Sequence, residues 1–194
     1  MKKIFTALAF VLLVSACGGG GGKPPRNLDN ACSIVSQKSG WLKSMKAVQR
    51  KWGIPVHVQM ATIHQESKFV SDARTPFRYA IGVIPMGRQS SAFGFSQALD
   101  ATWKEYQQDQ RRFSAKRDRF SDAVDFMGWY MDGSSDRLGI SKYDARNQYL
   151  AYHEGRTGFA RGSYNKKAWL VRVSGAVADR SEMYRSQLIR CGKA

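Results

Sequence analysis

The segment from residue 55 to residue 69 reads PVHVQMATIHQESKF and has the hydrophobic spacing of a buried helix. Its apolar residues Val56, Met60 and Ile63 recur every three or four positions, which places them on one face of an α-helix. Pro55 precedes them and suits the first turn of a helix, where its missing N–H costs no hydrogen bond. The segment therefore predicts a helix that starts with Pro55 and packs its apolar face into a core.

Glu66 lies one turn beyond Ile63 on this predicted helix, about 60° from the apolar stripe. A carboxyl group at the edge of a core loses part of its hydration, which raises its pKa and keeps it protonated as a general acid. The alternative is a solvent-exposed glutamate in the last turn, and the spacing of this segment alone favours that alternative. Motifs elsewhere in the chain shift the balance toward the general acid.

The chain from about residue 30 onward is helical in pattern, with breaks at Gly and Ser and almost no alternating strand signal. Residues 70–96, rich in Gly, Ser and Pro, are predicted to form a long loop. Asp100 and Ser121 are expected to cap helices, and the last helix is expected to bury Trp169, Val173, Val177, Tyr184 and Leu188. The further helices are predicted at 30–38, 41–52 with Gly53 as its end, 100–110, 121–132, from the capping sequence 141–144 to Gly155, and over 165–190 as one helix or two. The pattern predicts one mainly α domain.

The N-terminus has the features of an export signal. A charged start, Met1-Lys2-Lys3, is followed by an apolar run from Ile4 to Ala16, which is too short to span a bilayer. Small residues and then Cys17 resemble the lipobox of bacterial lipoproteins, in which the cysteine is lipidated and becomes the new N-terminus. An ordinary secretory signal or a buried core segment is the alternative. We therefore expect a signal peptide over 1–16, a lipidated Cys17 with a flexible tether over 17–29, and a catalytic domain over 30–194.

The net charge of the 194-residue chain is +16, from 31 basic and 15 acidic residues. Loss of Lys2 and Lys3 with the signal peptide leaves 29 basic residues and a charge of +14, so the charge belongs to the mature protein. A charge of this size predicts an anionic partner, and export argues against nucleic acid. Basic and aromatic residues do alternate over 111–120, but a solvated helix face is the favoured interpretation.

The cysteines divide between two uses. With Cys17 assigned to lipid, Cys32 and Cys191 remain, and an even pair in an oxidising compartment favours a disulfide. Only three histidines are present and no Cys/His spacing is typical of a metal site, so no metal is expected.

Three segments in order resemble the lysozyme-like soluble lytic transglycosylase family, which is itself similar to goose-type lysozyme. His64 to Phe69 (HQESKF) resembles its Glu-Ser motif, Ala92 to Gln97 (AFGFSQ) its Gly-Leu-Met-Gln motif, and Ala151 to Gly155 (AYHEG) its Ala-Tyr-Asn-Ala-Gly motif. The resemblance covers about residues 40–185 and implies a mainly α, lysozyme-like single domain. The interval between the first two motifs is longer than usual in the family, so residues 74–90 are expected to be an insertion.

The resemblance implies a role for each matching residue. Glu66 would be the catalytic acid and base, with Ser67 as a hydrogen-bonding support and Tyr152 close to the glutamate. Gly94, Phe95 and Gln97 would line the sugar cleft, although Phe95 and Ser96 replace Leu and Met there. His153 and Glu154 replace Asn and Ala and would add a titratable pair near the cleft, with a surface position at the helix end as the favoured alternative for Glu154. Helical spacing favours core packing over sugar stacking for Trp103, Trp129 and Tyr130.

The implied activity is cleavage of the β-1,4 bond between N-acetylmuramic acid and N-acetylglucosamine in peptidoglycan, with formation of a 1,6-anhydro product and without a cofactor. A hydrolytic muramidase and a non-catalytic peptidoglycan-binding lipoprotein are the alternatives. The expected partners are glycan strands and, through the lipid anchor, a membrane; the sequence leaves an envelope or secretion machine open. Gly18 after the lipidated cysteine resembles lipoproteins sent to the outer membrane, so we expect a periplasmic protein anchored there.

Overall fold

The computed structural model describes residues 23–81 and 84–194, so the predicted signal peptide and Cys17 lie outside the described residues. The described chain is mainly helical, as the sequence predicts, and contains one two-stranded sheet. None of its helices is long and apolar enough to cross a membrane. The elements are α1 (Ala31–Gln37), α2 (Ser39–Trp52), α3 (Val56–Ser67), β1 (Phe77–Ala80), β2 (Ile84–Arg88), α4 (Asp100–Asp109), α5 (Phe120–Leu138), α6 (Ala145–Ala160), the 3-10 helix η1 (Ser163–Lys166) and α7 (Ala168–Arg190).

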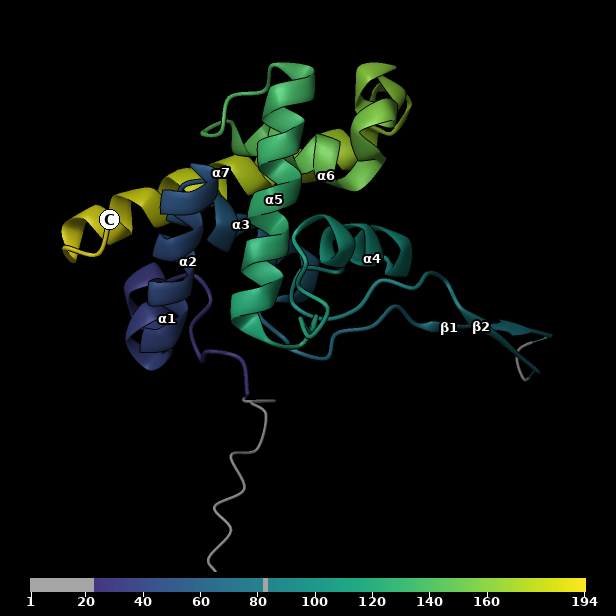
Figure 1. Cartoon of the computed structure of the whole chain (residues 1–194), viewed down its shortest axis with the longest axis horizontal. Coiled ribbons are helices and arrows are strands. Elements are labelled where there is room, and N and C mark those ends of the chain that lie inside the picture. Colours follow the sequence, from purple (N-terminus) through teal and green to yellow (C-terminus); the bar gives the residue numbers. More distant parts are fainter. Residues whose placement is uncertain (1–22, 82–83) are drawn as a thin grey trace, which may run out of the picture.

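Helix α3 lies in the middle of the molecule and contacts α2, α5, α6 and α7 (Figure 1). Ten of its twelve residues are buried, which is why its sequence is apolar on more than one face. Gly53 ends α2 in a left-handed conformation, and Pro55 follows as the residue before α3 and not, as predicted, within its first turn. This tight connection sets the course of α3 through the core.

Several predicted helix ends are wrong in detail. Asp100 and Ser121 do not cap α4 and α5, because the residues before these helices are Leu99 and Arg119 and neither offers a side-chain cap. Asp144 does cap α6, by accepting a hydrogen bond from the backbone N–H of Asn147. Helix α6 continues past Gly155 to Ala160, with a kink at that glycine, where φ is 75° and ψ is 156°.

The prediction for the last helix is partly wrong. It is one helix, α7, preceded by η1, and Val177, Tyr184 and Leu188 are buried on it. Trp169 in its first turn is 49% exposed, and Val173 is only partly buried. The amphipathic pattern could not separate the first turn of α7 from the part that reaches the core.

The segment predicted as a loop over 70–96 contains an antiparallel hairpin of β1 and β2. The hairpin projects from the helical body (Figure 1) and lies within the 74–90 segment expected to be inserted. The sequence did not reveal the hairpin because its strands are short, contain Gly and Pro, and show little alternation of polar and apolar residues. The pairing is irregular between Phe77 and Tyr79, which further weakens that pattern.

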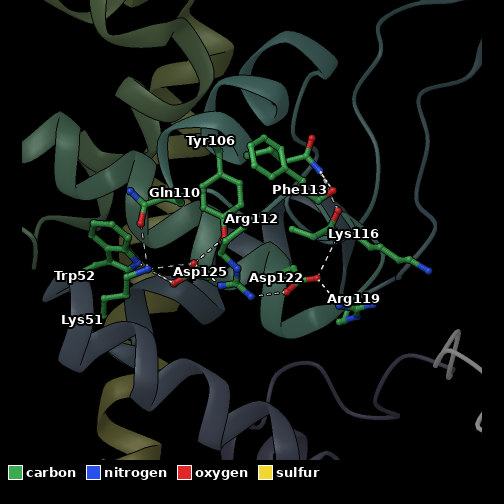
Figure 2. Close-up of polar contacts among 12 residues, drawn as sticks. Lys51, Trp52, Tyr106, Gln110, Arg112, Phe113, Lys116, Arg119, Asp122 and Asp125 are labelled. Atoms are coloured by element: carbon green, nitrogen blue, oxygen red, sulfur yellow. Dashed lines mark hydrogen bonds and ion pairs between the residues drawn. The ribbon is translucent and has the colours of Figure 1, made fainter.

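The basic and aromatic segment 111–120 is held against α5 by two buried aspartates (Figure 2). Arg112 pairs with both, at 2.9 Å from Asp122 and 2.7 Å from Asp125. Arg119 also pairs with Asp122, at 3.1 Å. These arginines therefore support the fold, and the segment is not, as predicted, a solvated helix face, because nearly all of it lies between α4 and α5.

Asp125 has the largest set of donors in this network. Besides Arg112 it accepts hydrogen bonds from the Tyr106 hydroxyl at 2.7 Å and from the Trp52 indole N–H at 2.9 Å, and Lys51 lies 3.4 Å away (Figure 2). Burial alone would raise the pKa of Asp125, but these donors and cations outweigh it and lower the pKa below its ordinary value of 3.8. The ionised carboxylate thus joins α2, α4 and α5.

We expect Asp125→Asn to lower the free energy of unfolding at pH 7 by about 2 kcal/mol, because the hydrogen bonds to a charged acceptor are lost. A lowered carboxyl pKa stabilises the fold above pH 3.8, and this contribution disappears as the pH falls through the folded-state pKa. The difference between wild type and variant should therefore shrink in acid. Urea unfolding at pH 7 and pH 3 measures it. Asp136→Asn, at an exposed position of α5, is the matched control; equal losses in the two variants would contradict the prediction.

The two ends of the folded domain meet at Cys32 and Cys191. Their sulfur atoms lie 2.21 Å apart and their Cα atoms 6.4 Å apart, across 159 positions of sequence. Cys32 is in α1 and Cys191 directly follows α7. The arrangement joins the first helix to the last.

Candidate active site

Glu66 lies in the last turn of α3, where the helix leaves the core. Lys68 and Phe69, directly after the helix, both have positive φ angles, and the chain turns sharply there. Burial raises the pKa of Glu66 from its ordinary 4.5 to about 8, against the opposing effects of a hydrogen bond with Tyr149 and of the Lys68 ammonium. At neutral pH the carboxyl group is therefore largely protonated, as a general acid requires.

Two tyrosines of α6 lie beside this carboxyl group. Tyr149 is buried and shares a hydrogen bond with Glu66, and the charge of Glu66 also acts on Tyr152. The Tyr152 hydroxyl donates to the backbone carbonyl of Ser96 at 2.7 Å, so it fixes the loop and not the glutamate. The sequence reasoning missed Tyr149; its position one helical turn before Tyr152 was the signal that could have revealed it.

Ser67 also differs from its expected role. Its hydroxyl donates to the carbonyl of Phe95 at 2.8 Å, with the carbonyl of Ile63 at 3.3 Å, and forms no hydrogen bond with Glu66. The serine thus joins the end of α3 to the loop at 94–97.

The loop at 94–97 is built around Gly94. Its φ is 79°, and a Cβ atom there would lie 2.2 Å from the carbonyl oxygen of Arg117, so no side chain fits. Phe95, expected in the sugar cleft, is 2% exposed and packs against Trp41 and Phe120 in the core. Gly94 has no side chain, and the side chain of Phe95 lies in the core. Both residues therefore shape the loop, and neither presents a side chain to a ligand.

Gln97 is oriented by the same loop. Its Nε2 atom donates to the carbonyls of Ala73 at 2.9 Å and of Gly94 at 2.8 Å. Because both partners are carbonyl oxygens, the amide orientation is fixed and both of its N–H groups are used. The Oε1 atom is left as an acceptor for a ligand hydroxyl or amide.

A cavity of about 220 Å³ brings part of the predicted site together. Gln97, Tyr152, His153 and Glu154 line it, together with residues of α4 and α5 that include Thr102 and Tyr130. A larger cavity of about 640 Å³ lies beside Trp41 and Phe120, and of the predicted site residues only Phe95 borders it. The smaller cavity is the candidate cleft, because Tyr152 connects it to Glu66.

Glu154 is neither a second acid nor an exposed helix-end residue. Its side chain is 4% exposed and lies 2.7 Å from the Lys167 ammonium, with Ser163 and His153 as further partners. Burial would raise its pKa, but these three hydrogen bonds lower the pKa to about 2. Glu154 is therefore ionised at neutral pH and links α6 to Ser163 of η1 and to Lys167, and His153 borders the cavity beside it.

Within residues 23–81 and 84–194, no cluster of three or more His, Cys, Asp or Glu side chains could hold a metal ion. The chemistry available at this site is acid and base catalysis by one half-buried carboxyl group, next to a cavity with polar groups for orienting a ligand.

A family model described as the transglycosylase SLT domain matches residues 5–191, which is nearly the whole chain. No curated protein and no solved structure matches the chain. With its three sequence motifs gathered around a half-buried glutamate in a helical domain, the chain belongs to the transglycosylase SLT domain family.

Proposed function

We propose that this protein is a lytic transglycosylase that cleaves the β-1,4 bond between N-acetylmuramic acid and N-acetylglucosamine in peptidoglycan. The observation that carries the proposal is the raised pKa of Glu66, about 8, together with its position beside Tyr152, which lines the candidate cleft. A family that acts on peptidoglycan supplies the substrate class.

Glu66 acts twice in the proposed reaction. Its proton passes to the glycosidic oxygen as that bond breaks, and the acetamido oxygen of the muramic acid attacks the anomeric carbon. The resulting carboxylate then takes the proton of the sugar's 6-hydroxyl, whose oxygen displaces the acetamido oxygen and closes the 1,6-anhydro ring. Such a cycle needs one carboxyl group, in contrast to the pair used by most glycosidases. Glu154 is paired with Lys167, and the groups that shift the pKa of Glu66 include no second acid, which supports this mechanism.

Tyr149 and Lys68 stabilise the carboxylate form that the second step requires. Both lower the pKa of Glu66 and oppose the effect of burial. The carboxyl group thus keeps an acidity between that of a fully buried acid and that of a surface glutamate, and both protonation states are accessible near neutral pH.

We also propose that the mature protein is attached to a membrane through lipidated Cys17 and works in the periplasm, at the outer membrane. The lipobox-like sequence before Cys17 and the Gly-rich stretch after it support this location. The net positive charge of the mature chain would hold it close to anionic lipids and to the carboxylates of the wall. Work with an envelope or secretion machine would fit the same location.

Mass spectrometry of digested peptidoglycan tests the reaction. We expect muropeptides with 1,6-anhydro ends. Reducing ends would instead identify a hydrolytic muramidase. No released product, with peptidoglycan binding retained, would identify a non-catalytic lipoprotein. Either of these results contradicts the proposal.

Tyr149→Phe should alter the pH dependence of cleavage. The active form of Glu66 is protonated, so the rate should fall as the pH rises through about 8. Loss of the Tyr149 hydrogen bond, which lowers the pKa of Glu66, should move this fall to higher pH and reduce kcat about tenfold, because the carboxylate is less stable. A pH profile of kcat measures both effects. Tyr143→Phe, at a residue that is 68% exposed, is the control; an unmoved alkaline limb in Tyr149→Phe would contradict the assignment.

A further inference from the structure

The hairpin of β1 and β2 projects from the helical body as a sheet of two strands (Figure 1). Two strands alone are marginally stable in water, because they bury little apolar surface. The hairpin nevertheless exposes large apolar side chains, since Ile81 is 90% and Met86 66% exposed and Phe77 is exposed as well. No other large apolar side chain of the described residues is as exposed as Ile81. Apolar groups that gather on an exposed projection indicate a surface that another molecule covers.

The segment that contains the hairpin is cationic. Between Asp72 and Asp100 the chain has three arginines and no acidic residue. Arg74 and Arg88 are exposed, and each guanidinium lies 4.2 Å from the centre of an aromatic ring, a contact that leaves its charge in place. Asp100, at the end of the segment, is itself paired with Arg117 at 2.7 Å. The three positive charges of the segment are therefore not balanced within it.

Exposed aliphatic side chains next to arginines match the interface of a lipid bilayer. Aliphatic groups gain free energy when they leave water for the boundary of the acyl chains. Guanidinium groups remain at the level of the headgroups, where they pair with phosphates, and anionic headgroups add to the attraction. Binding to the carboxylates of the wall would need the arginines alone. The exposed aliphatic groups of Ile81 and Met86 therefore favour an anionic membrane as the partner.

The position of the hairpin allows one membrane to meet both it and an anchored N-terminus. The hairpin and the first described residues, which begin at Lys23, both lie on the lower side of the molecule in Figure 1. Six positions separate Lys23 from Cys17, and six residues span at most about 20 Å. An anchor at Cys17 would therefore keep this side of the domain close to the membrane.

We propose that the β1–β2 hairpin places Ile81 and Met86 in the interface of an anionic membrane, as a second membrane contact besides Cys17. This inference rests on the membrane attachment put forward under the proposed function. One anchor alone leaves the domain free to rotate, whereas two separate contacts restrict its orientation and strengthen the attachment. The hairpin thus sets how the domain faces the membrane.

Vesicle binding by the mature chain without its lipid tests the inference. Residues 17–194 with Cys17→Ser keep every described residue and remove the anchor that would mask the hairpin. The probe is vesicles of phosphatidylglycerol and phosphatidylethanolamine, and flotation measures the bound fraction. We expect Ile81→Asp and Met86→Asp each to weaken binding at least about tenfold, because an apolar contact is lost. Ile189→Asp, at a residue of α7 that is 56% exposed, makes the same change of charge away from the hairpin and is the control.

A nitroxide label at Ile81→Cys reports insertion directly. In this chain Cys32 and Cys191 are joined, so the label reacts only at residue 81. On anionic vesicles the label should be open to dissolved oxygen and shielded from a water-soluble nickel chelate, whereas a label at Ile189→Cys should stay open to the chelate. Equal access of the chelate to both labels, or equal effects of the aspartate variants at 81 and 189, would overturn the inference. Loss of binding to purified sacculi in Ile81→Asp, with vesicle binding retained, would also overturn it and make the wall the partner.

A cleavage assay separates this inference from the proposed function. Ile81 and Met86 lie outside the proposed catalytic and binding groups, so their aspartate variants should release muropeptides from sacculi at the rate of the unsubstituted chain. If that chain cleaves and the vesicle results fail, the inference falls and the proposed reaction stands. If it does not cleave and the vesicle results hold, the proposed reaction falls and the hairpin contact stands. Labelling of the full chain with palmitate in cells tests the attachment at Cys17 separately.

Discussion

Glu66→Gln is expected to reduce peptidoglycan cleavage by at least about 10³-fold, because the amide can neither donate nor accept the proton that moves in the reaction. The side chains have nearly the same shape, so the fold around α3 should remain. Release of soluble muropeptides from purified sacculi measures the effect. Glu182→Gln, at an exposed position of α7, removes a carboxylate without touching the site. Full activity in Glu66→Gln would show that the catalytic group has been misassigned.

The same substitution should stabilise the protein at alkaline pH. The pKa of Glu66 is about 8 in the folded chain against an ordinary 4.5, so the folded state binds this proton more tightly than the unfolded state. The resulting stabilisation is complete below pH 4.5 and is lost as the pH rises to about 8. Between pH 5 and pH 8 the variant should therefore gain at least about 1 kcal/mol relative to wild type, measured by denaturant unfolding. A gain that is the same at both pH values would mean that burial does not raise the pKa of this group.

Loss of the link between Cys32 and Cys191 should cause the second large effect that we expect, a fall in the free energy of unfolding. Closing a loop of this length stabilises a fold by about 4–5 kcal/mol in the chain-entropy model, since the unfolded chain loses freedom. Cys32→Ser or treatment with a reductant should lower the free energy of unfolding by an amount of this order. Urea unfolding with and without reductant measures the change in each protein.

The matched comparison is the double variant Cys32→Ser, Cys191→Ser, which should be no less stable than Cys32→Ser alone and should not respond to reductant. Alkylation followed by mass analysis provides a direct check. Two modified thiols at these positions without reductant, or a wild type whose stability is insensitive to reductant, would contradict the bond.

The helices that the sequence predicted best are those whose ends are marked by local capping or stop signals. Gly53 ends α2 and Asp144 caps α6 through contacts within a few residues, and both are visible in the sequence. The hairpin of β1 and β2 was missed because strand pairing depends on a partner that the local pattern does not contain. The kink at Gly155 was mistaken for a helix end, since a glycine permits either conformation.

Within the candidate site the sequence identified residue types more successfully than their contacts. Phe95 sits in a motif expected to bind sugar, yet its ring is in the core. Ser67 and Tyr152 each donate to a backbone carbonyl of the 94–97 loop, whereas Tyr149, outside the motif, bonds to Glu66. A hydroxyl group has one proton to donate, and which acceptor receives it depends on the packing of α3 against α6.

The 55–69 segment by itself determined that the chain forms a buried central helix and that a carboxyl group lies at its edge, because helical periodicity is a local property. The motifs at 92–97 and 151–155, which follow it in the order typical of the family, determined the family. Only the tertiary structure decided that Glu66 is desolvated enough for a pKa of about 8. It also decided that Glu154 is kept ionised by Lys167, Ser163 and His153. The difference is physical: the pKa and the pairing of a charged side chain depend on neighbours brought from distant parts of the chain, and no local pattern specifies these neighbours.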